Sequence, residues 1–464
     1  MASISLPFGR GRVEAEIPDR RLAGVLRSKA HGYRPDAAEC ELVRRALANP
    51  IGTPRLRELA KGKRNVVIIS SDHTRPVPSR IILPELVGEI RAGSPDAEIT
   101  VLVATGFHRP TTEAELLDKY GEELYRRAGL RFVVHESGKS DDMVSLGALP
   151  SGGQLRINRL AAQADLLVGE GFIEPHFFAG FSGGRKSVLP GVASRITVLA
   201  NHCSAFIDSP FARTGILDGN PIHRDMLFAA EQARLAFICN VVIDGDKKII
   251  AAFAGHYDQA HRAGCSFVEE LSGVEAIPAP IVITTNGGYP LDQNIYQSVK
   301  GMTAAEATCT PGGVIIMVSA CGDGHGGQSF YDTFANEKDK EKIMARFLAT
   351  PSDQTIPDQW EAQILCRILL RHPVIMVTQA PREMVEAMQM HYAADLPRPW
   401  PCARAAGGAA APPEISGPER QGPGPGPGAH RAAHLRPGEK AGHPRGVRQR
   451  HPPGGAVRLR HHRV

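Results

Sequence analysis

One stretch of the sequence, residues 174–202, combines imidazole, amine and guanidinium side chains with many glycines. It reads EPHFFAGFSGGRKSVLPGVASRITVLANH and contains His176, Arg185, Lys186 and His202. Histidine is the side chain that most often transfers protons near neutral pH, and it is a common metal ligand. A desolvated lysine loses its proton more readily and can attack a carbonyl or thiocarbonyl carbon. The stretch therefore predicts a site for proton transfer and covalent tethering beside exposed backbone.

The GFSGGRKS segment within this stretch is similar to a phosphate-binding loop in its glycine content. A P-loop requires glycine directly before the lysine, and Arg185 occupies that position. No acidic residue at the end of an apolar strand is a convincing partner for magnesium. A P-loop nucleoside triphosphatase is therefore disfavoured. A backbone nest for some phosphate group, formed by Ser182, Gly183 and Gly184, is kept as a hypothesis.

Each of these residues also has an ordinary structural explanation. Most lysines lie on the surface, and Lys186 is assigned to a pocket because glycines precede it and SVLPG follows it. His176 has the alternative of a buried imidazole bonded to backbone. His202, on a helix expected to begin near Ser194, fits a core position and a metal site equally well. Their roles stay open on the local sequence alone.

Two further loops carry polar side chains directly after predicted strands. Asp72 and Arg75 follow the apolar run NVVIIS, and His108 follows EITVLVATG. Thr112 and Glu115 have the spacing of a capping box, so a helix is expected to begin after Thr112. His108 is therefore predicted to lie in a short loop between a strand and a helix, where binding and catalytic residues are common.

A third group of polar side chains is expected on two helices nearer the end of the chain. Tyr296 and Lys300 share one face of a helix that begins after Pro290, and Gln297 lies beside them. Lysine and amide groups suit the carboxylate of a small acid, although a solvated helix surface has the same pattern. Trp360 opens a second helix, which is predicted from DQWEAQILCRILLRH.

The elements that position these residues repeat a β/α pattern. Apolar, β-branched runs alternate with helical patterns, as is typical of largely parallel sheets with crossover helices. The runs expected to be strands are 65–72, 98–106, 131–137, 164–171, 279–288, 312–321 and 372–379. Ligands of such sheets bind beyond the carboxyl ends of the strands, where the polar residues of this chain occur. The predicted fold class is α/β.

A chain of 464 residues is long for a single core, so we expect two α/β domains. Residues 1–274 form the predicted N-terminal domain, with the glycine-rich segment and the strand-end loops. Residues 275–395 form the second domain, which begins within the segment LSGVEAIPAP and carries the helices with Tyr296 and Trp360.

Residues 396–464 differ in kind from the rest of the chain. They contain 12 Lys and Arg against 3 Glu, a local charge of +9 that leaves −4 for residues 1–395. Proline, glycine, alanine, arginine and histidine dominate, so disorder is expected. One interpretation is a basic tether for nucleic acid or a membrane. The other is out-of-frame translation of a GC-rich gene beginning after MHYAAD, a segment expected to continue as a helix.

The remaining composition indicates a cytoplasmic protein without a membrane or nucleic-acid partner. Eight cysteines occur singly, without a CxxC pair, which indicates reduced thiols rather than a cysteine-rich metal site. The first residues lack the pattern of a signal peptide, and no apolar run is long enough to cross a bilayer. Basic charge is confined to the tail, so the overall charge of +5 says little about nucleic-acid binding.

Taken together, the motifs resemble the lactate racemase family that uses a nickel-pincer nucleotide. The resemblance is carried by SSDHTRP, GFHRPTTEAE, EPHFFAGFSGGRKSVLPG, NH, GGYPLDQNIYQSVKGM and DQW, in this order, and extends to about Asp395. It implies an isomerase that racemises or epimerises lactate or a related 2-hydroxy acid. It also implies a nickel cofactor, pyridinium-3-thioamide-5-thiocarboxylic acid mononucleotide, the enzymes that synthesise it as partners, and an active site in the cleft between two domains.

The resemblance gives each candidate residue a role. Lys186 resembles the lysine that bonds covalently to the cofactor, and His202 resembles the protein ligand of nickel. His108 and His176 resemble the paired acid/base histidines, which act on opposite sides of the substrate. The other resemblances are to cofactor-binding residues (Asp72, Arg75, Ser182, Gly183 and Gly184) and to substrate-binding residues (Arg75, Tyr296, Gln297, Lys300 and Trp360).

The C-terminus departs from the family, whose chains continue beyond MHYAAD with another helix and strand. Two hypotheses from other classes are kept beside the racemase. A non-catalytic nucleotide or phosphate-binding protein would use the GFSGGRKS loop, and its three histidines, His108, His176 and His202, would not converge. A basic scaffold would bind nucleic acid through the tail with strong salt dependence.

Overall fold

A computed structural model describes residues 1–127 and 129–396 of the chain. The tail predicted for 396–464 therefore lies outside the described residues, apart from its first residue. Leu396 is buried in a cluster with Ala15, Ile316 and Val318. The tail prediction is wrong at this residue, because a leucine next to an apolar sheet face gains free energy by burial.

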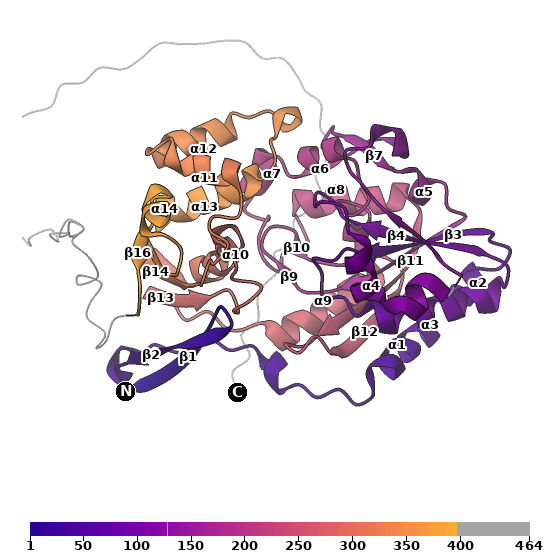
Figure 1. The fold of residues 1–464 in the computed structure, drawn as a ribbon, viewed down its shortest axis with the longest axis horizontal. Helices are drawn as coiled ribbons and strands as arrows, with labels where there is room; N and C mark the ends of the chain where they lie inside the picture. The colour runs from indigo at the N-terminus through magenta and orange to yellow at the C-terminus, as the bar shows by residue number, and fades with distance from the viewer. Residues whose placement is uncertain (128, 397–464) are drawn as a thin grey trace, which may run out of the picture. The chain divides into compact units, whose positions relative to one another are not determined.

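A six-stranded sheet forms the larger part of the structure (Figure 1). Its strand order is β12-β11-β8-β3-β4-β5, with β12 antiparallel to β11 and every other neighbouring pair parallel. The bounds are β3 Asn65–Ser71, β4 Glu98–Ala104, β5 Arg131–Val134, β8 Leu166–Phe172, β11 Leu235–Ile243 and β12 Ile249–Gly255. The four strands predicted here are confirmed, whereas β11 and β12 were missed although LAFICNVVI is as apolar as the others.

Helices cover both faces of this sheet, and strand alternation divides the core between them. Val66 and Ile68 face one cluster of helices, and Val67 and Ile69 face the other. The first face is covered by α1 (Glu39–Ala48), α3 (Ser79–Gly93) and α4 (Glu113–Glu122), and the second by α8 (Pro221–Gln232) and α9 (Gln259–Ser272). The strands are buried on both faces, which explains their nearly continuous apolar sequences.

The strand order reverses between β3 and β8. From β3 the chain continues to β4 and β5 on one side, and from β8 it continues to β11 and β12 on the other. The loops that leave the two neighbouring strands therefore diverge and open a crevice at their carboxyl ends. The segments that follow are 72–78 after β3 and 173–183 after β8, and both contain predicted site residues.

A second sheet contains four parallel strands in the order β13-β14-β15-β16. The strands are β13 Ala279–Thr285, β14 Cys309–Val318, β15 Val374–Val377 and β16 His391–Ala393. Its helices are α10 Ile295–Glu306, α11 Gln328–Ala335, α12 Lys340–Leu348, α13 Gln359–Arg371 and α14 Arg382–Ala387. The helix expected through MHYAAD is wrong. Gln389 adopts φ 63°, which ends the helical path, and the chain then pairs with β15 as β16.

The N-terminal hairpin, β1 (Ala2–Phe8) and β2 (Gly11–Ile17), packs against the second sheet. Thr285 Oγ1 donates a hydrogen bond of 2.8 Å to the carbonyl of Pro7, and Ala15 belongs to the apolar cluster of β14. The division at residue 274 placed this hairpin with the first domain, and that division remains a prediction.

The smaller elements connect the larger ones. They are α2 Leu56–Leu59, β6 Met143–Ala148, β7 Gln154–Asn158, α5 Arg159–Ala162 and α7 Ser204–Asp208. Seven of the cysteines fall within the described part of the chain, and all seven are free thiols. Within the same part, none of the helices combines the length and the apolarity that crossing a membrane requires.

Candidate active site

Every residue predicted for the site lines one cavity of about 290 Å³. The cavity lies at the carboxyl ends of β3, β4 and β8 and is also lined by α10 and α13. These residues are Asp72, Arg75, His108, His176, Ser182, Gly183, Gly184, Lys186, His202, Tyr296, Gln297, Lys300 and Trp360. The three histidines therefore converge, which contradicts the hypothesis of a non-catalytic phosphate-binding loop.

A buried arginine shapes the loop that carries the lysine. Arg185 is 0% exposed and donates hydrogen bonds to the carbonyl oxygens of Ala179 (2.7 Å), Phe181 (2.9 Å) and Gly183 (3.3 Å). It satisfies three carbonyl groups of a loop whose short strands, β9 (Pro175–His176) and β10 (Gly180–Phe181), form few hydrogen bonds of their own. This explains why arginine stands where a P-loop has glycine.

Gly184 allows the same loop to approach helix α9. Its φ of +55° is unfavourable for other residues, and a Cβ atom there would lie 2.6 Å from the ring of His261. Its backbone N–H donates to Asn240 Oδ1 at 2.7 Å, which anchors the turn on β11. The position therefore requires glycine for both conformation and space.

We expect Gly184→Ala to lower the free energy of unfolding by about 2–4 kcal/mol, since strain and overpacking act together. Denaturant unfolding of the full chain would measure the change. Gly88→Ala is the matched control, because Gly88 lies in α3 and a Cβ atom added there would meet nothing within 4 Å. This control is expected to be neutral or to stabilise by up to about 1 kcal/mol. An equal response of the two variants would contradict the role of Gly184.

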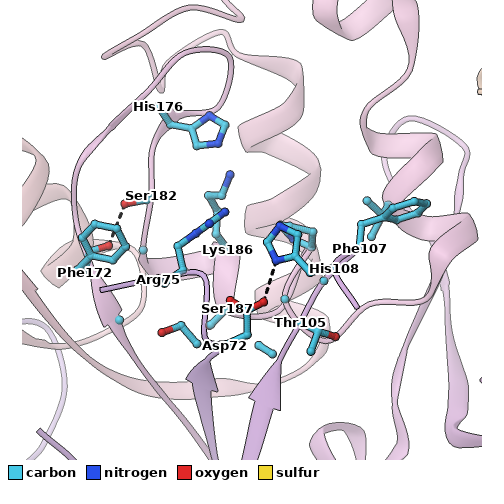
Figure 2. Close-up of a pocket in the computed structure, with 18 of the residues that line it drawn as sticks. Asp72, Arg75, Thr105, Phe107, His108, Phe172, His176, Ser182, Lys186 and Ser187 are labelled. Atoms are coloured by element: carbon cyan, nitrogen blue, oxygen red, sulfur yellow. Dashed lines mark hydrogen bonds and ion pairs between the residues drawn. The ribbon is translucent and has the colours of Figure 1, made fainter. Parts of the chain in front are cut away.

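Lys186 projects into the cavity from the 3-10 turn Gly184–Ser187. Figure 2 shows its amine extending beside Arg75 toward His176. Among the described residues Nζ has no hydrogen-bond partner, and it lies 5.7 Å from the centre of the Phe178 ring. Burial, followed by the charge of Arg185, lowers the pKa of Lys186 well below its usual value. Lys186 thus has the environment of a nucleophilic amine.

His202 follows helix α6 (Arg195–Asn201) as its C-cap, and the helix begins after Ser194, near which its start was predicted. Its Nδ1 lies 3.0 Å from the carbonyl of Val198, so Nδ1 carries the proton and Nε2 keeps a free lone pair. Burial, with the charge of Lys186, lowers the pKa of His202 to about 3. A neutral imidazole held in a fixed tautomer is what a metal ligand requires.

His108 is oriented by Asp72, which is 1% exposed (Figure 2). Asp72 Oδ2 accepts a hydrogen bond of 2.8 Å from His108 Nδ1, and Oδ1 accepts one of 2.7 Å from Thr74 Oγ1. Burial raises the pKa of Asp72, but the hydrogen bond with His108 and further contributions from His108, Thr74 and Arg75 together outweigh burial, so the net direction is downward. Asp72 therefore stays ionised and leaves His108 Nε2 for proton transfer.

The helix that follows His108 begins as the capping box predicted. Thr112 Oγ1 accepts from the backbone N–H of Glu115, and the Glu115 carboxylate accepts from the N–H of Thr112. This local structure fixes the length of the loop that presents His108.

His176 lies in the loop after β8, stacked against Phe177 with ring centres 5.1 Å apart. The backbone N–H of Ala179 donates to Nδ1 at 3.3 Å, which places the proton of the neutral ring on Nε2. Burial, followed by the charge of Lys186, lowers the pKa of His176 well below its usual value. The two histidines thus rest in complementary forms, with His108 as proton acceptor and His176 as hydrogen-bond donor.

The remaining predicted residues come from α10 and α13. Lys300 Nζ donates to Gln297 Oε1 at 2.6 Å, and the Tyr296 hydroxyl donates to Asp358 Oδ1 at 3.0 Å. Trp360 packs edge-on against His202, with ring centres 5.1 Å apart. The predicted helix starts are confirmed, and these helices supply a lysine and an amide to the cavity wall.

Two acidic residues beside Trp360 were not predicted. Asp358 and Glu361 both line the cavity. An acid before a helix is usually explained as its N-cap, but Asp358 adopts φ 64° and makes no capping hydrogen bond. Its carboxylate accepts from Tyr296 instead. The sequence signal that could have indicated them is the pair of acids in DQWE, which lie on either side of Trp360, a residue already assigned to the site.

The fold and the cavity define an α/β protein with a cavity at a sheet switch point, where one buried lysine and three imidazoles converge. Family models identify it further. Residues 8–215 match the lactate racemase N-terminal domain, and residues 274–412 match the lactate racemase C-terminal domain. The chain belongs to the lactate racemase family.

Individual relatives agree with this assignment. The lactate racemases of Thermoanaerobacterium thermosaccharolyticum and Lactiplantibacillus plantarum are 59% and 55% identical, each over 85% of this chain and 93% of the relative. The structure of the Thermoanaerobacterium lactate racemase apoprotein superposes with a TM-score of 0.82 at 58% identity, over 85% of this chain and 93% of that chain. A Thermotoga maritima protein, 20% identical with a TM-score of 0.59 over 76% of this chain and 91% of that chain, shares the fold.

Proposed function

We propose that this chain racemises a small 2-hydroxy acid, with lactate as the first substrate to test, using a nickel-pincer nucleotide. The observation that carries the proposal is the convergence of His108, His176, Lys186 and His202 on one cavity beside Arg75. The names of the relatives support the reaction and the substrate. A racemase must move a proton on either face of its substrate, and two imidazoles meet this requirement.

The residues of the cavity fit such a cofactor. No group of three or more His, Cys, Asp or Glu residues suited to a metal occurs among the residues that the structure describes. A nickel ion at His202 would therefore need most of its ligands from a bound organic group, as a pincer provides. Lys186 would hold the group covalently, and Ser182, Gly183 and Gly184 would let backbone approach it. When bound, the cofactor supplies an acceptor for the hydride of carbon 2.

The protein's own residues bind the substrate and manage its proton. Arg75 and Lys300 supply positive charge for the carboxylate, and Gln297 supplies an amide donor. His108 Nε2 accepts the hydroxyl proton of one enantiomer while Asp72 stabilises the charged ring. His176 takes the same role for the other enantiomer, for which its bond with the N–H of Ala179 must open. Trp360 and Phe107, whose ring centres lie 6.0 Å apart, exclude water from the reacting atoms.

We further propose a cytoplasmic location, with the cofactor made by separate biosynthetic enzymes. The free thiols of the seven described cysteines fit a reducing compartment.

The test is to produce the full chain together with the cofactor's biosynthetic enzymes and to add L-lactate or D-lactate. Chiral chromatography should show each enantiomer converting to an equal mixture, because the equilibrium constant between enantiomers is one. The chain produced without those enzymes is the control and should be inactive. A chain that carries nickel and cofactor but converts neither lactate nor other 2-hydroxy acids would overturn the proposed function.

A further inference from the structure

Glu361 is a buried carboxyl group to which the proposed racemase mechanism assigns no role. It lies in the first turn of α13, is 1% exposed and lines the cavity. Its Oε1 has no hydrogen-bond partner among the described residues. A buried carboxyl without partners is costly, so a carboxyl kept at a cavity wall indicates a function there.

Lys300, on α10, lines the same cavity as Glu361, and the charges of the two side chains influence each other. Lys300 is an exposed residue, and its amine donates to Gln297 Oε1 at 2.6 Å rather than to a carboxylate. Burial raises the pKa of Glu361 to about 8. The charge of Lys300 acts to lower this pKa, and the charge of Asp358 acts to raise it. Burial also lowers the pKa of Lys300, and Glu361 opposes this. Lys300 and Glu361 thus form a pair. The other charged or titratable groups that interact with this pair are Arg75, Glu174, Tyr296 and Asp358.

The charge of the pair depends on how many protons it holds. With two protons, Lys300 is cationic and Glu361 is neutral, so the pair carries +1 and attracts a carboxylate. With one proton, the pair is neutral overall, and an ionised Glu361 would repel an entering carboxylate. The bound substrate therefore favours the form with two protons.

We propose that Glu361 is a positioning residue that must hold a proton when the substrate carboxylate binds at Lys300. Neutralising Glu361 releases the full charge of Lys300, which then turns from Gln297 to the substrate. This inference rests on the proposed function, since it takes Lys300 as the cation that binds the carboxylate. It adds a proton-linked step of substrate binding that is separate from the proton transfers of His108 and His176.

The first test measures KM and kcat for L-lactate between pH 7 and 9 on chains loaded with cofactor. In the wild type, KM should rise with pH, approaching about tenfold per pH unit above the pKa of Glu361. Glu361→Gln should remove this rise, so that its KM at pH 9 is about tenfold lower than that of the wild type. Its kcat should change less than its KM. A purely structural role would weaken binding at every pH.

Two further variants keep the test decisive. Glu361→Asp retains a carboxyl group and should retain the rise in KM. Glu383→Gln makes the same chemical change at an exposed position on α14 and should match the wild type. A wild type that racemises lactate with the same KM profile as Glu361→Gln would overturn the inference and leave the proposed function intact. A loaded wild type that racemises no 2-hydroxy acid would overturn the proposed function as well.

A second readout needs neither cofactor nor activity. In the full chain without cofactor, an amine-acetylating reagent labels each lysine according to its neutral fraction, and peptide mass spectrometry resolves Lys300. Glu361→Gln removes the nearby carboxyl and should increase labelling of Lys300 at pH 8 by about three- to tenfold. Labelling of the exposed Lys61 serves as the internal control. Unchanged labelling of Lys300 would overturn the pairing of Glu361 with Lys300.

Discussion

Replacing Lys186 by alanine is expected to remove the covalent cofactor and to reduce racemase activity by at least about 1000-fold, to the limit of detection. The expected loss is large because the cofactor carries the hydride transfer, and no other side chain of the cavity can replace that chemistry. Lys186 is the amine beside the glycine-rich loop, and its lowered pKa gives it the neutral form that attacks a thiocarbonyl carbon. Intact-protein mass spectrometry with nickel analysis would measure the adduct directly.

Two controls separate the chemistry of Lys186 from its packing. Lys186→Arg keeps a long basic side chain but cannot lose its proton, so it should also lack the adduct. Lys61→Ala changes an exposed lysine and should keep both adduct and activity. An adduct of the same mass in Lys186→Ala would show that the tether lies elsewhere. A wild type without adduct, when cofactor synthesis is verified on another acceptor, would contradict covalent tethering.

Replacing either acid/base histidine by asparagine is expected to lower kcat by about 10²–10⁴-fold for both enantiomers. Both directions must slow together, because the equilibrium constant between enantiomers fixes the ratio of their kcat/KM values at one. The two variants should differ in a single turnover. His108→Asn should still form bound 2-keto acid from one enantiomer, and His176→Asn from the other.

Rapid quenching followed by chiral and keto-acid analysis would measure both effects. His391→Asn, an exposed change on β16, is the control and should behave as the wild type. If His176→Asn kept wild-type rates, the imidazole would be part of the aromatic packing with Phe177 and Phe178 rather than an acid/base group.

Local features of the site could be read from the sequence because they depend on neighbours along the chain. The capping box of Thr112 and Glu115 and the shared face of Tyr296 and Lys300 follow from spacings of three or four residues. The strands that precede the site loops were recognised from apolar runs, because strands buried on both faces require them. The types and order of the chemical residues then indicated the family.

Contacts between distant segments were decided only by the tertiary structure. Asp72 reaches His108 across 36 positions and Tyr296 reaches Asp358 across 62, and no local period encodes such pairs. For the same reason, the sequence did not predict three further features. These are the packing of the N-terminal hairpin on the second sheet, strand β16 and the role of Arg185 inside its loop. Glu361 is the sharpest example. The sequence determined that a carboxyl follows Trp360, but only the packing of α13 against α10 removed it from water and placed it at the wall that holds Lys300.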